Sequence, residues 1–550
     1  MAVAGTSNLF FNRDTKVFVS QTNGRPIAVT GFAANVLTST GHGLTTGDRI
    51  MVTSYSALTG VTAGTVYYAI VLSSSTFSFA TTLANALAAT AITLGGTTAA
   101  GTVTSLDSFQ ALTAIPTTTG TVMTLPMAGN AFATGEVVSV FNSTDPAALD
   151  LNGVYQIVTA TTASITINTT ATAPLAAYWP SLKVTRSNLW EIPVLAGYSA
   201  SQKTTTSEIT LNEMTNSAGV SRRGRQMFNN AISPTDWSFD TYIRPYKSTN
   251  QYAVEEPLWA NLVAKNYALN SGSAGTQTST WGAGGVTRGT SDLVFDFNSS
   301  NTTTLGTFDL YFVLGANRAT GRDYASGATA GDHTIYKVTD AVINECSMTF
   351  AIDGISTISW TGMGSAMTEC GALFATNAGN QAITATNNFI RNRLTALTLV
   401  GTTPSITASV TLTGGTVSIS NNISYLTPET LGQVNKPLAH ITGTRTIKGT
   451  FTAYMDEVSN GTIDLFQSLA EKANTVVTNS FQLDFYVGGQ ASNNLPNGPG
   501  IQIKVQTAHL EIPSINFDDV ISTEVAWHAL PSTIGGTNEI SAVRYVGINA

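Results

Sequence analysis

The sequence predicts a mainly β protein, built from two tandem copies of one β fold with a single helix each and two small β modules inserted in the first copy. Three observations predict this fold class. Only 11% of the 550 residues are charged, and Gly, Ser, Thr and Asn separate short runs of alternating apolar residues, which is typical of antiparallel β structure. The other two observations are internal repeats at two different spacings. A chain of this length also exceeds what one hydrophobic core usually holds.

The first strand is expected in KVFVSQTNG, residues 16–24, and its partner in NLWEIPVL, residues 188–195. A strand without a partner would leave its backbone N–H and C=O groups unpaired. We therefore predict that the two segments form a hairpin whose turn has been opened to admit the inserted modules. Hairpin tips tolerate such insertions because the two chain ends lie close together.

The inserted residues repeat at a spacing of 88. The segment GLTTGDRIMV, residues 43–52, aligns with AFATGEVVSV, residues 131–140, so that Gly47 corresponds to Gly135 (135 − 47 = 88). Each copy has a Gly-Asp or Gly-Glu turn, a strand, a loop and a hairpin of alternating apolar residues, which predicts a small β module.

The predicted boundaries are residues 29–108 for the first module and 109–180 for the second. Tyr67 and Tyr155 keep the same spacing of 88, and Tyr68 follows the first of them. These three aromatic residues are candidates for a ligand-stacking surface, or they fill the small core of each module.

A larger repeat covers the rest of the chain. Residues 337–362 align without gaps on residues 504–529 at an offset of 167. The identical pairs are Lys337/Lys504, Val338/Val505, Ala341/Ala508, Ser347/Ser514, Phe350/Phe517 and Trp360/Trp527. We expect Phe350, Trp360, Phe517 and Trp527 to anchor the cores of the two copies, since large aromatic residues are more often core than binding surface.

Each copy contains one predicted helix with an apolar face, in AVEEPLWANLVAKNYAL (residues 253–269) and in GTIDLFQSLAEKA (residues 461–473). The opening hairpin recurs as ITASVTLTGGTVSISNNISYL, residues 406–426, with Gly-Gly as its expected turn. The predicted domains are residues 1–28 joined with 181–395, and residues 396–550.

Composition narrows the classes of function. The net charge of −8 and the absence of a long Lys/Arg run argue against a sequence-reading nucleic-acid binder. The low charge suggests that neighbouring molecules cover much of the surface, because a soluble monomer usually carries more. Cys346 and Cys370 fit no metal spacing or disulfide framework and are expected to be free thiols. The start of the chain lacks the pattern of a signal peptide, and no apolar run reaches membrane length.

Motifs for catalysis or cofactor binding are not apparent. His42 has no His counterpart in the second module, and TGMGSAM, residues 361–367, lacks the third glycine of a dinucleotide site. No nucleophile elbow, carboxylate pair or metal-ligand spacing stands out. We therefore expect no cofactor, no metal and no enzymatic activity.

The chain outside the modules resembles the major tail tube proteins of long-tailed bacteriophages. The segments that carry this resemblance are FFNRDTKVFVSQ, LWEIPVLAGYSASQKTTTSEITLNEM, RRGRQMFNNAISPTDWSFDTYIRPY, AVEEPLWANLVA and IDGISTISWTG. The resemblance implies two packed β-sheets flanked by a helix, six such folds in a ring, and rings stacked into a tube that conducts DNA. A chain with two fused copies is similar to the subgroup whose ring is a trimer with pseudo-sixfold symmetry.

The segment of residues 201–232 is too long and polar for a simple connection. By resemblance it corresponds to the arm that reaches the adjacent ring. Its charged residues are candidates for contacts between rings, although an arginine triplet taken alone is more often a solvated loop. These candidates are Glu208, Glu213, Arg222, Arg223 and Arg225.

The resemblance also implies partners and a location. The expected partners are the chain itself, as homotrimeric rings, together with the tail terminator, the tail tip or baseplate, and the tape-measure protein. DNA would pass through the lumen without sequence-specific contacts, and no membrane would be involved. The protein would be assembled in the bacterial host cytoplasm and reside in the virion tail. The alternative is a virion adhesive or decoration protein that binds host-surface glycans through the inserted modules.

Overall fold

The computed structural model is mainly β, as predicted, with three short α-helices among the residues that it describes. Those residues are 15–22, 24–55, 58–62, 65–96, 101–106, 109–169, 171–210, 225–248, 251–263, 286–288, 292–297, 305–314, 334–352, 354–373, 390, 395–403, 405–431, 434–472, 480–488, 491–492, 495–496, 499–517, 519–533, 536 and 538–546.

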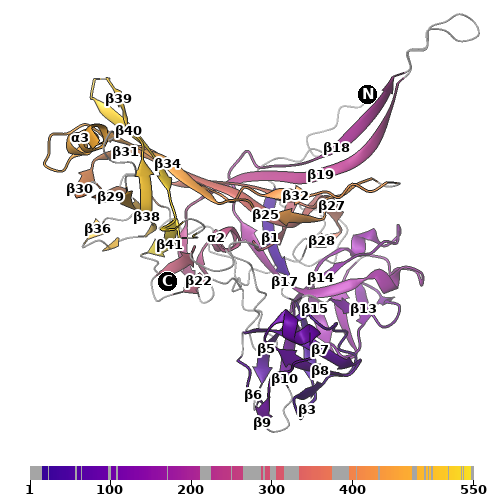
Figure 1. The fold of residues 1–550 in the computed structure, drawn as a ribbon. Coiled ribbons are helices and arrows are strands. Elements are labelled where there is room, and N and C mark those ends of the chain that lie inside the picture. The colour runs from indigo at the N-terminus through magenta and orange to yellow at the C-terminus, as the bar shows by residue number, and fades with distance from the viewer. Residues whose placement is uncertain are drawn as a thin grey trace, which may run out of the picture.

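One long antiparallel sheet runs across the whole body (Figure 1), and we call it the long sheet. In spatial order its strands are β18 (Ser199–Thr210), β19 (Arg225–Tyr242), β26 (Thr357–Gly364), β25 (Thr334–Ala351), β31 (Leu412–Ser420), β34 (Thr446–Tyr454), β40 (Ser522–Ala529) and β39 (Ser514–Asn516). The strands β18 and β39 lie at opposite ends of it.

A second layer packs on one face of the long sheet. In the first half its order is β17 (Lys183–Ile192), β1 (Lys16–Thr22), β24 (Phe308–Leu314), the first part of β25, and β27 (Ala366–Cys370). In the second half the order is β30 (Ser405–Val410), β29 (Ala396–Thr403), β35 (Ser480–Gly488), β38 (Gly500–Leu510) and β41 (Ile540–Val546). The two orders run in parallel, strand for strand.

The register of the two halves agrees in detail. The pairing of β24 with β25 shifts between Phe308 and Leu310, and that of β35 with β38 shifts between Phe481 and Leu483. Within the described residues the same β-bulge therefore stands at the same place in both halves, where it bends the sheet.

The opened hairpin is confirmed. Strand β1 pairs antiparallel with β17, from Val17 opposite Ile192 to Thr22 opposite Ser187, although more than 160 residues separate them in sequence. Strand β1 also pairs with β24, so it lies inside the sheet with both edges satisfied.

The two expected helices are present. Helix α2 (Glu256–Val263) is buried along its whole length, and α3 (Thr462–Lys472) buries Leu465 and Leu469. One hydrophobic cluster extends through both halves and includes α2, α3 and the inner faces of both layers. The halves therefore share a single core.

The first module is a seven-stranded sheet with its own core. Its strands are β2 (Arg25–Val29), β10 (Gly101–Ser105), β5 (Arg49–Tyr55), β7 (Val66–Ser73), β8 (Thr76–Ala80), β4 (Val36–Thr38) and β3 (Gly31–Ala33), beside a short α1 (Leu83–Leu87) and the pair β6 (Leu58–Thr59) and β9 (Gly95–Gly96). Its sheet begins at Arg25.

The second module is joined to the body. Its strands are β11 (Gln110–Ala111), β12 (Thr117–Thr119), β13 (Val122–Pro126), β14 (Val137–Phe141), β15 (Gly153–Ala160) and β16 (Ser164–Asn168), with single 3-10 turns at Leu149–Leu151 and Trp179–Ser181. Strand β14 pairs with β17, and β15 pairs in parallel with β28 (Ala372–Leu373). Both modules lie below the second layer, on the side away from the long sheet (Figure 1).

The remaining strands are short. They are β20 (Pro245–Ser248), β21 (Gln251–Ala253), β22 (Val286–Arg288), β23 (Leu293–Asp296), β32 (Ser424–Leu426), β33 (Ala439–Ile441), β36 (Ala491–Ser492) and β37 (Leu495–Pro496). Among them β23 pairs with β41 and so links the two halves a second time.

Two expectations are wrong. The Gly-Gly pair at residues 414 and 415 is not a hairpin turn: both glycines lie within β31, where the pairing with β34 has a bulge, and β29 and β30 form the hairpin instead. Phe517 is not a core anchor either, because its side chain is 80% exposed, whereas Phe350, Trp360 and Trp527 are buried.

Candidate assembly surfaces

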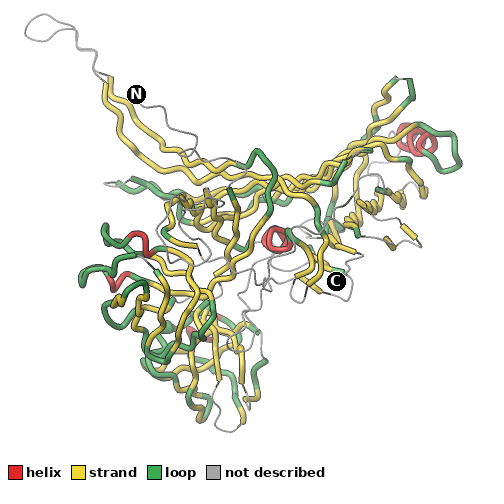
Figure 2. Tube along the Cα trace, turned by 180° about the vertical axis from the view of Figure 1, so that it is seen from behind, coloured by secondary structure: helices red, strands yellow, loops and turns green. Residues whose placement is uncertain are grey.

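Strands β18 and β19 form a ribbon that projects away from the body (Figures 1 and 2). From Lys203 to Glu208 the side chains of β18 are exposed, and across the ribbon Met227 and Phe228 of β19 are exposed as well. We call this ribbon the arm. The expectation of a long loop over residues 201–232 is therefore wrong at both ends, because paired strands reach Thr210 and resume at Arg225.

The structure places only part of the predicted charged set. Glu208 lies on β18 with its side chain exposed, and Arg225 begins β19 opposite Thr210. Glu213, Arg222 and Arg223 lie outside the described residues.

The long sheet has one apolar and one polar face, because successive side chains of a strand point to opposite sides. On β25, Cys346, Met348 and Phe350 are buried, while Ser347 and Thr349 between them point to the other side and remain accessible. The same alternation on the other long-sheet strands produces a polar face rich in Ser and Thr.

Charged side chains on this polar face are mostly acidic. Asp236 of β19 and Glu524 of β40 are exposed, and Glu345 of β25 accepts a 2.6 Å hydrogen bond from Ser418 Oγ. Lys448 of β34 is an exposed basic residue of the same face. The face is therefore small, polar and negatively biased.

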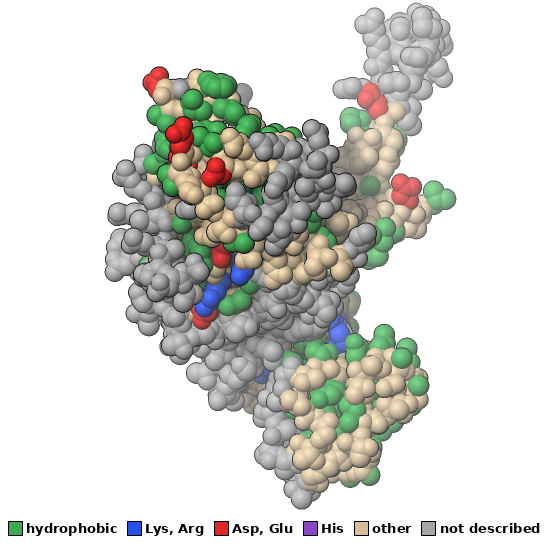
Figure 3. Space-filling model, turned by 60° about the vertical axis from the view of Figure 1, so that its left-hand side comes forward, with side chains coloured by type: hydrophobic (Ala, Val, Ile, Leu, Met, Phe, Trp, Pro, Cys, Tyr) green, Lys and Arg blue, Asp and Glu red, His purple; other side chains and the backbone are tan. Residues whose placement is uncertain are grey.

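The end of the long sheet at β39 is apolar. Phe517, Val520 and Val458 are exposed there, on neighbouring loops near the start of α3. Figure 3 brings this end forward and shows hydrophobic side chains beside acidic ones over it. Exposed apolar side chains that gather in one place mark an interaction surface more often than isolated ones do.

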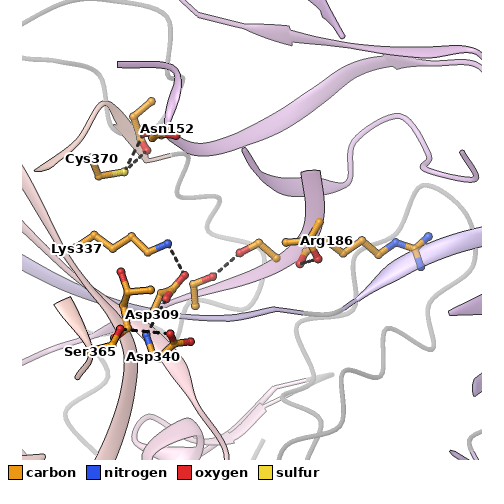
Figure 4. A network of polar contacts seen from close by, with 12 residues as sticks. Asn152, Arg186, Asp309, Lys337, Asp340, Ser365 and Cys370 are labelled. Carbon is orange, nitrogen blue, oxygen red and sulfur yellow. Dashed lines mark hydrogen bonds and ion pairs between the residues drawn. The ribbon is translucent and has the colours of Figure 1, made fainter. Parts of the chain in front are cut away.

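Polar contacts attach the second module to the body (Figure 4). Arg186 of β17 makes a two-pronged ion pair with Glu136, with Nη2 to Oε1 at 2.7 Å and Nε to Oε2 at 3.1 Å, and both side chains are buried. Nearby, Cys370 Sγ lies 3.5 Å from the backbone oxygen of Asn152. A buried pair of this geometry holds two segments in one register.

A second cluster in Figure 4 lies within the body. Lys337 Nζ is 2.7 Å from Asp309 Oδ2, which links β25 to β24. Ser365 Oγ donates to Asp340 Oδ2 at 3.3 Å. These contacts fix the bend of β25 at the point where it passes from one layer to the other.

The two modules use the same turn. Gly47 N–H donates to Ala69 O at 2.9 Å, and Gly135 N–H donates to Ile157 O at 2.9 Å, 88 residues later in both partners. Both glycines have positive φ, at 99° and 87°, which explains why glycine occupies this position.

His42 holds a turn in the first module, and Asn130 holds the matching turn in the second. Leu44 N–H donates to His42 Nδ1 at 3.1 Å, and Phe132 N–H donates to Asn130 Oδ1 at 3.3 Å. The other end of each side chain donates to the backbone carbonyl 31 residues further on, at 2.9 and 3.0 Å. Burial lowers the pKa of His42, which favours the neutral ring that this pattern needs.

The module tyrosines do not form an exposed stacking surface. Tyr67 is 7% exposed and Tyr155 is 1% exposed, and both belong to the module cores. Tyr155 Oη donates to the backbone oxygens of Asp150 and Leu151 at 3.1 Å. Tyr68 is partly buried. The interpretation of Tyr67 and Tyr155 as ligand-stacking platforms is therefore wrong.

A buried polar chain links the halves beneath the long sheet. Trp259 Nε1 of α2 donates to Tyr545 Oη at 2.7 Å, and Tyr545 Oη donates to Glu255 Oε1 at 2.5 Å. Burial raises the pKa of Glu255 to about 7. Because Tyr545 lies on β41 and Glu255 precedes α2, the chain ties the C-terminal strand to the first half.

Other chemistry is sparse in the described part of the chain. Both cysteines are free and buried, and burial raises the pKa of the Cys346 thiol. No group of three or more His, Cys, Asp or Glu side chains that could hold a metal ion occurs among the described residues. The described helices include none that is long and apolar enough to cross a bilayer.

Comparison with known proteins agrees with the resemblance drawn from the sequence. No protein-family model matches the chain. Over 363 residues, which are 64% of this chain and 70% of the other, it is 28% identical to "Tail tube protein pb6" of Escherichia phage T5.

Proposed function

We propose that this chain, which is similar to a bacteriophage tail tube protein, is a tail tube protein of a long-tailed bacteriophage, that three copies close into a ring and that stacked rings form the conduit for genome DNA. The protein has a structural role in the virion tail. The trimeric ring, its pseudo-sixfold symmetry and the passage of DNA are the parts that we propose.

One observation carries the proposal: the long sheet contains the same four-strand order twice. The first half contributes β18, β19, β26 and β25, and the second contributes β31, β34, β40 and the β38–β39 segment, in the same antiparallel arrangement. The repeat supports a duplicated tube fold, residues 1–28 with 181–395 and residues 396–550. The two matching units are joined through their sheet edges, and each end of the long sheet has a strand with one edge that no other described strand pairs with. Such an arrangement is suited to a ring in which sheets of successive chains join.

The register supports a closed barrel. Pairing across the first half and into the second follows one row of residues, Phe239, Trp360, Cys346, Ile419 and Ile447. In the sequence, WSFDTYIRPY (residues 237–246) matches GTFTAYMDEV (residues 449–458) at an offset of 449 − 237 = 212, so Phe451 corresponds to Phe239. The row therefore ends four residues (451 − 447 = 4) before the equivalent position. A shift of four residues per four strands tilts the strands by about 35°, within the range that barrels use.

Three chains with eight long-sheet strands each supply 3 × 8 = 24 strands. At about 4.8 Å between strands and a tilt of about 35°, they enclose a circle about 45 Å across, measured at the backbone. Such a barrel leaves room for a DNA duplex inside.

The polar face of the long sheet would line this lumen. Its Ser and Thr side chains and its acidic residues Asp236, Glu345 and Glu524 offer DNA phosphates little attraction. Both modules attach on the opposite side of the second layer, so they would project outward from the tube. Outward projection explains how a tube subunit accommodates about 150 inserted residues without narrowing its channel.

The arm would contact the adjacent ring, with Glu208 and Arg225 on its described strands and Glu213, Arg222 and Arg223 in the connecting segment. Ion pairs between these groups of opposite sign would set the angle between rings. The tail terminator, the tail tip or baseplate and the tape-measure protein are the further partners that a tube subunit requires.

Sedimentation velocity and negative-stain microscopy over a concentration series test the proposal. We expect a species of 3 × 57.5 = 172.5 kDa, and stacked rings of threefold outline at higher concentration. A monomer at every concentration, including in the presence of preformed tail tips, would contradict it.

A further inference from the structure

The two ends of the long sheet carry edges that fit one another. We propose that residues 514–517 of one chain pair antiparallel with β18 of the next chain, with Ser514 opposite Ser201. This inference rests on the proposed ring and names the strands and the register that close it. Among the described residues, β18 pairs only with β19 and β39 pairs only with β40, so each strand has one edge without a partner strand.

The junction between the two halves of one chain, where β25 pairs with β31, shows how the contact between two chains would be made. There the end of β25 pairs with β31 over seven residues, from Glu345 opposite Ser420 to Ala351 opposite Gly414. Within this junction Ser347 lies opposite Ser418. Phe350 is only 4% exposed because β31 and its neighbours cover it.

The 167-residue repeat contains a second copy of one side of this junction, the side formed by β25, in the second half of the chain. At an offset of 167, Ser347 corresponds to Ser514 and Phe350 corresponds to Phe517. The strand pairing agrees with this correspondence. Ser347 lies opposite Ser359, which lies opposite Asp240, and Ser514 lies opposite Glu524, which lies opposite Thr452. Thr452 and Asp240 are equivalent in the repeat of β19 and β34, at an offset of 452 − 240 = 212. Residues 514–517 therefore occupy the place that the end of β25 occupies in the first half.

The other side of the junction corresponds to β18. Ser418 pairs with Lys448, and Ser201 pairs with Asp236. Lys448 and Asp236 are equivalent in the repeat of β19 and β34, at an offset of 448 − 236 = 212. Ser201 thus holds the position of Ser418, and the serine pair inside the chain predicts a serine pair between chains.

The exposure of Phe517 supports the same contact. Its equivalent, Phe350, is buried by the strand that follows in the sheet, whereas no strand of the described part of the chain lies beside Phe517 at the free edge of β39. Docking of β18 from a second copy would cover Phe517 together with the apolar side chains of Val520 and Val458. It would also pair two sheet edges for which the described residues provide no partner strand and which would otherwise invite unspecific pairing.

One residue differs between the two junctions. Strand β25 is continuous, whereas Pro513 separates β38 from β39 and has no N–H to donate. Proline is typical of edge strands because it limits pairing with wrong partners. The contact between chains is therefore expected to begin after Pro513 and to be shorter than the junction within the chain.

Disulfide trapping tests the register in assembled full-length protein. Ser201→Cys combined with Ser514→Cys places two thiols opposite one another on the accessible polar face. The matched control combines Ser201→Cys with Ile515→Cys, whose side chain points to the other face. The native cysteines, Cys346 and Cys370, are buried and serve both variants as an equal background.

Mild oxidation of tubes made from the first pair should yield covalent dimers and trimers on a non-reducing gel, and at least tenfold less from the control pair. Phe517→Ser provides an independent readout: the melting temperature of the monomer should be unchanged, while the concentration needed for assembly should rise at least tenfold. Tubes that assemble from the first pair but do not cross-link above the control would overturn the register and leave the tube intact. If the wild-type chain itself forms no ring, both the contact and the proposed function are overturned.

Discussion

Trp527 lies directly opposite Gly449 on the neighbouring strand, and in the other half Trp237 lies directly opposite Gly362. In the sequence repeat Trp237 corresponds to Gly449, so the large and the small partner have exchanged strands between the halves. A Cβ on Gly449 would come within 2.7 Å of Trp527 Cζ2, and one on Gly362 would meet the indole of Trp237. In each half one tryptophan therefore packs over a glycine of the neighbouring strand. The tryptophan comes from β19 in the first half and from β40 in the second.

This arrangement predicts that Gly449→Ala destabilises the chain. The added methyl would overlap the indole and the backbone oxygen of Thr416, and such overpacking costs about 1–3 kcal/mol. Gly31→Ala is the control, since a Cβ there would meet only Thr38 at 3.6 Å. Thermal unfolding followed by near-UV circular dichroism measures both, and equal melting temperatures for the two variants would contradict the packing described.

Glu255 predicts a pH dependence of stability. Its pKa is raised by burial to about 7, above the value of roughly 4.3 expected in the unfolded chain. Between these two values the folded state holds a proton that the unfolded state has released, so the free energy of unfolding falls as pH rises through this window. The loss is on the order of 3 kcal/mol and is complete above pH 7.

Glu255→Gln should remove this pH dependence, because the amide is neutral throughout and can still accept from Tyr545. Urea unfolding at pH 5 and at pH 8 compares the two proteins. The account of Glu255 fails if the wild type and the variant show the same difference between the two pH values.

His42→Asn is predicted to be tolerated. Asn130 makes the equivalent contacts in the second module, so an asparagine at position 42 has both partners in reach. His42→Ala should cost about 1–3 kcal/mol, because it leaves buried backbone groups without partners. A comparison of melting temperatures decides: a catalytic or metal-binding role for His42 gains support only if Asn and Ala prove equally damaging to function with the fold intact.

The first module is predicted to be dispensable for assembly. Arg25 and Ser105 lie opposite one another at its base, so a short glycine linker can replace residues 25–105. The second module shares β17, and its Val137 and Val154 pack on body residues, so its removal should expose core. Electron microscopy of both deletions should show tubes for the first and aggregates for the second, and the reverse result would refute this division.

Much of the architecture could be predicted because internal repeats and the alternation of apolar and polar residues are visible in the sequence. The pairing of β1 with β17, the helices α2 and α3 and the 88-residue module repeat all follow from apolar periodicity and from the offset of glycines. Such patterns reflect burial, which is similar in each copy.

Register was harder to predict. Trp360 and Trp527 align in the sequence, yet Trp360 lies opposite Phe239 and Trp527 lies opposite Gly449 rather than opposite Phe451. A shift of two residues keeps a side chain on the same face, so alternation alone cannot detect it. The prediction of a turn at the Gly-Gly pair in β31 is wrong for a related reason, since glycine also occurs at bulges inside strands.

Phe517 could not be placed from the sequence at all. The repeat correctly identifies it as the counterpart of a buried residue, but burial of Phe350 depends on β31, and no described strand takes the place of β31 beside Phe517. In the proposed ring that strand comes from a second chain, which the pattern of one sequence does not reveal.

High-resolution electron cryomicroscopy of assembled wild-type tubes is the decisive experiment for the proposed ring. We expect rings of three chains, an inner barrel of 24 strands about 45 Å across at the backbone, and modules on the outer surface. Rings with another number of chains, or an inner wall built from strands other than those of the long sheet, would contradict it.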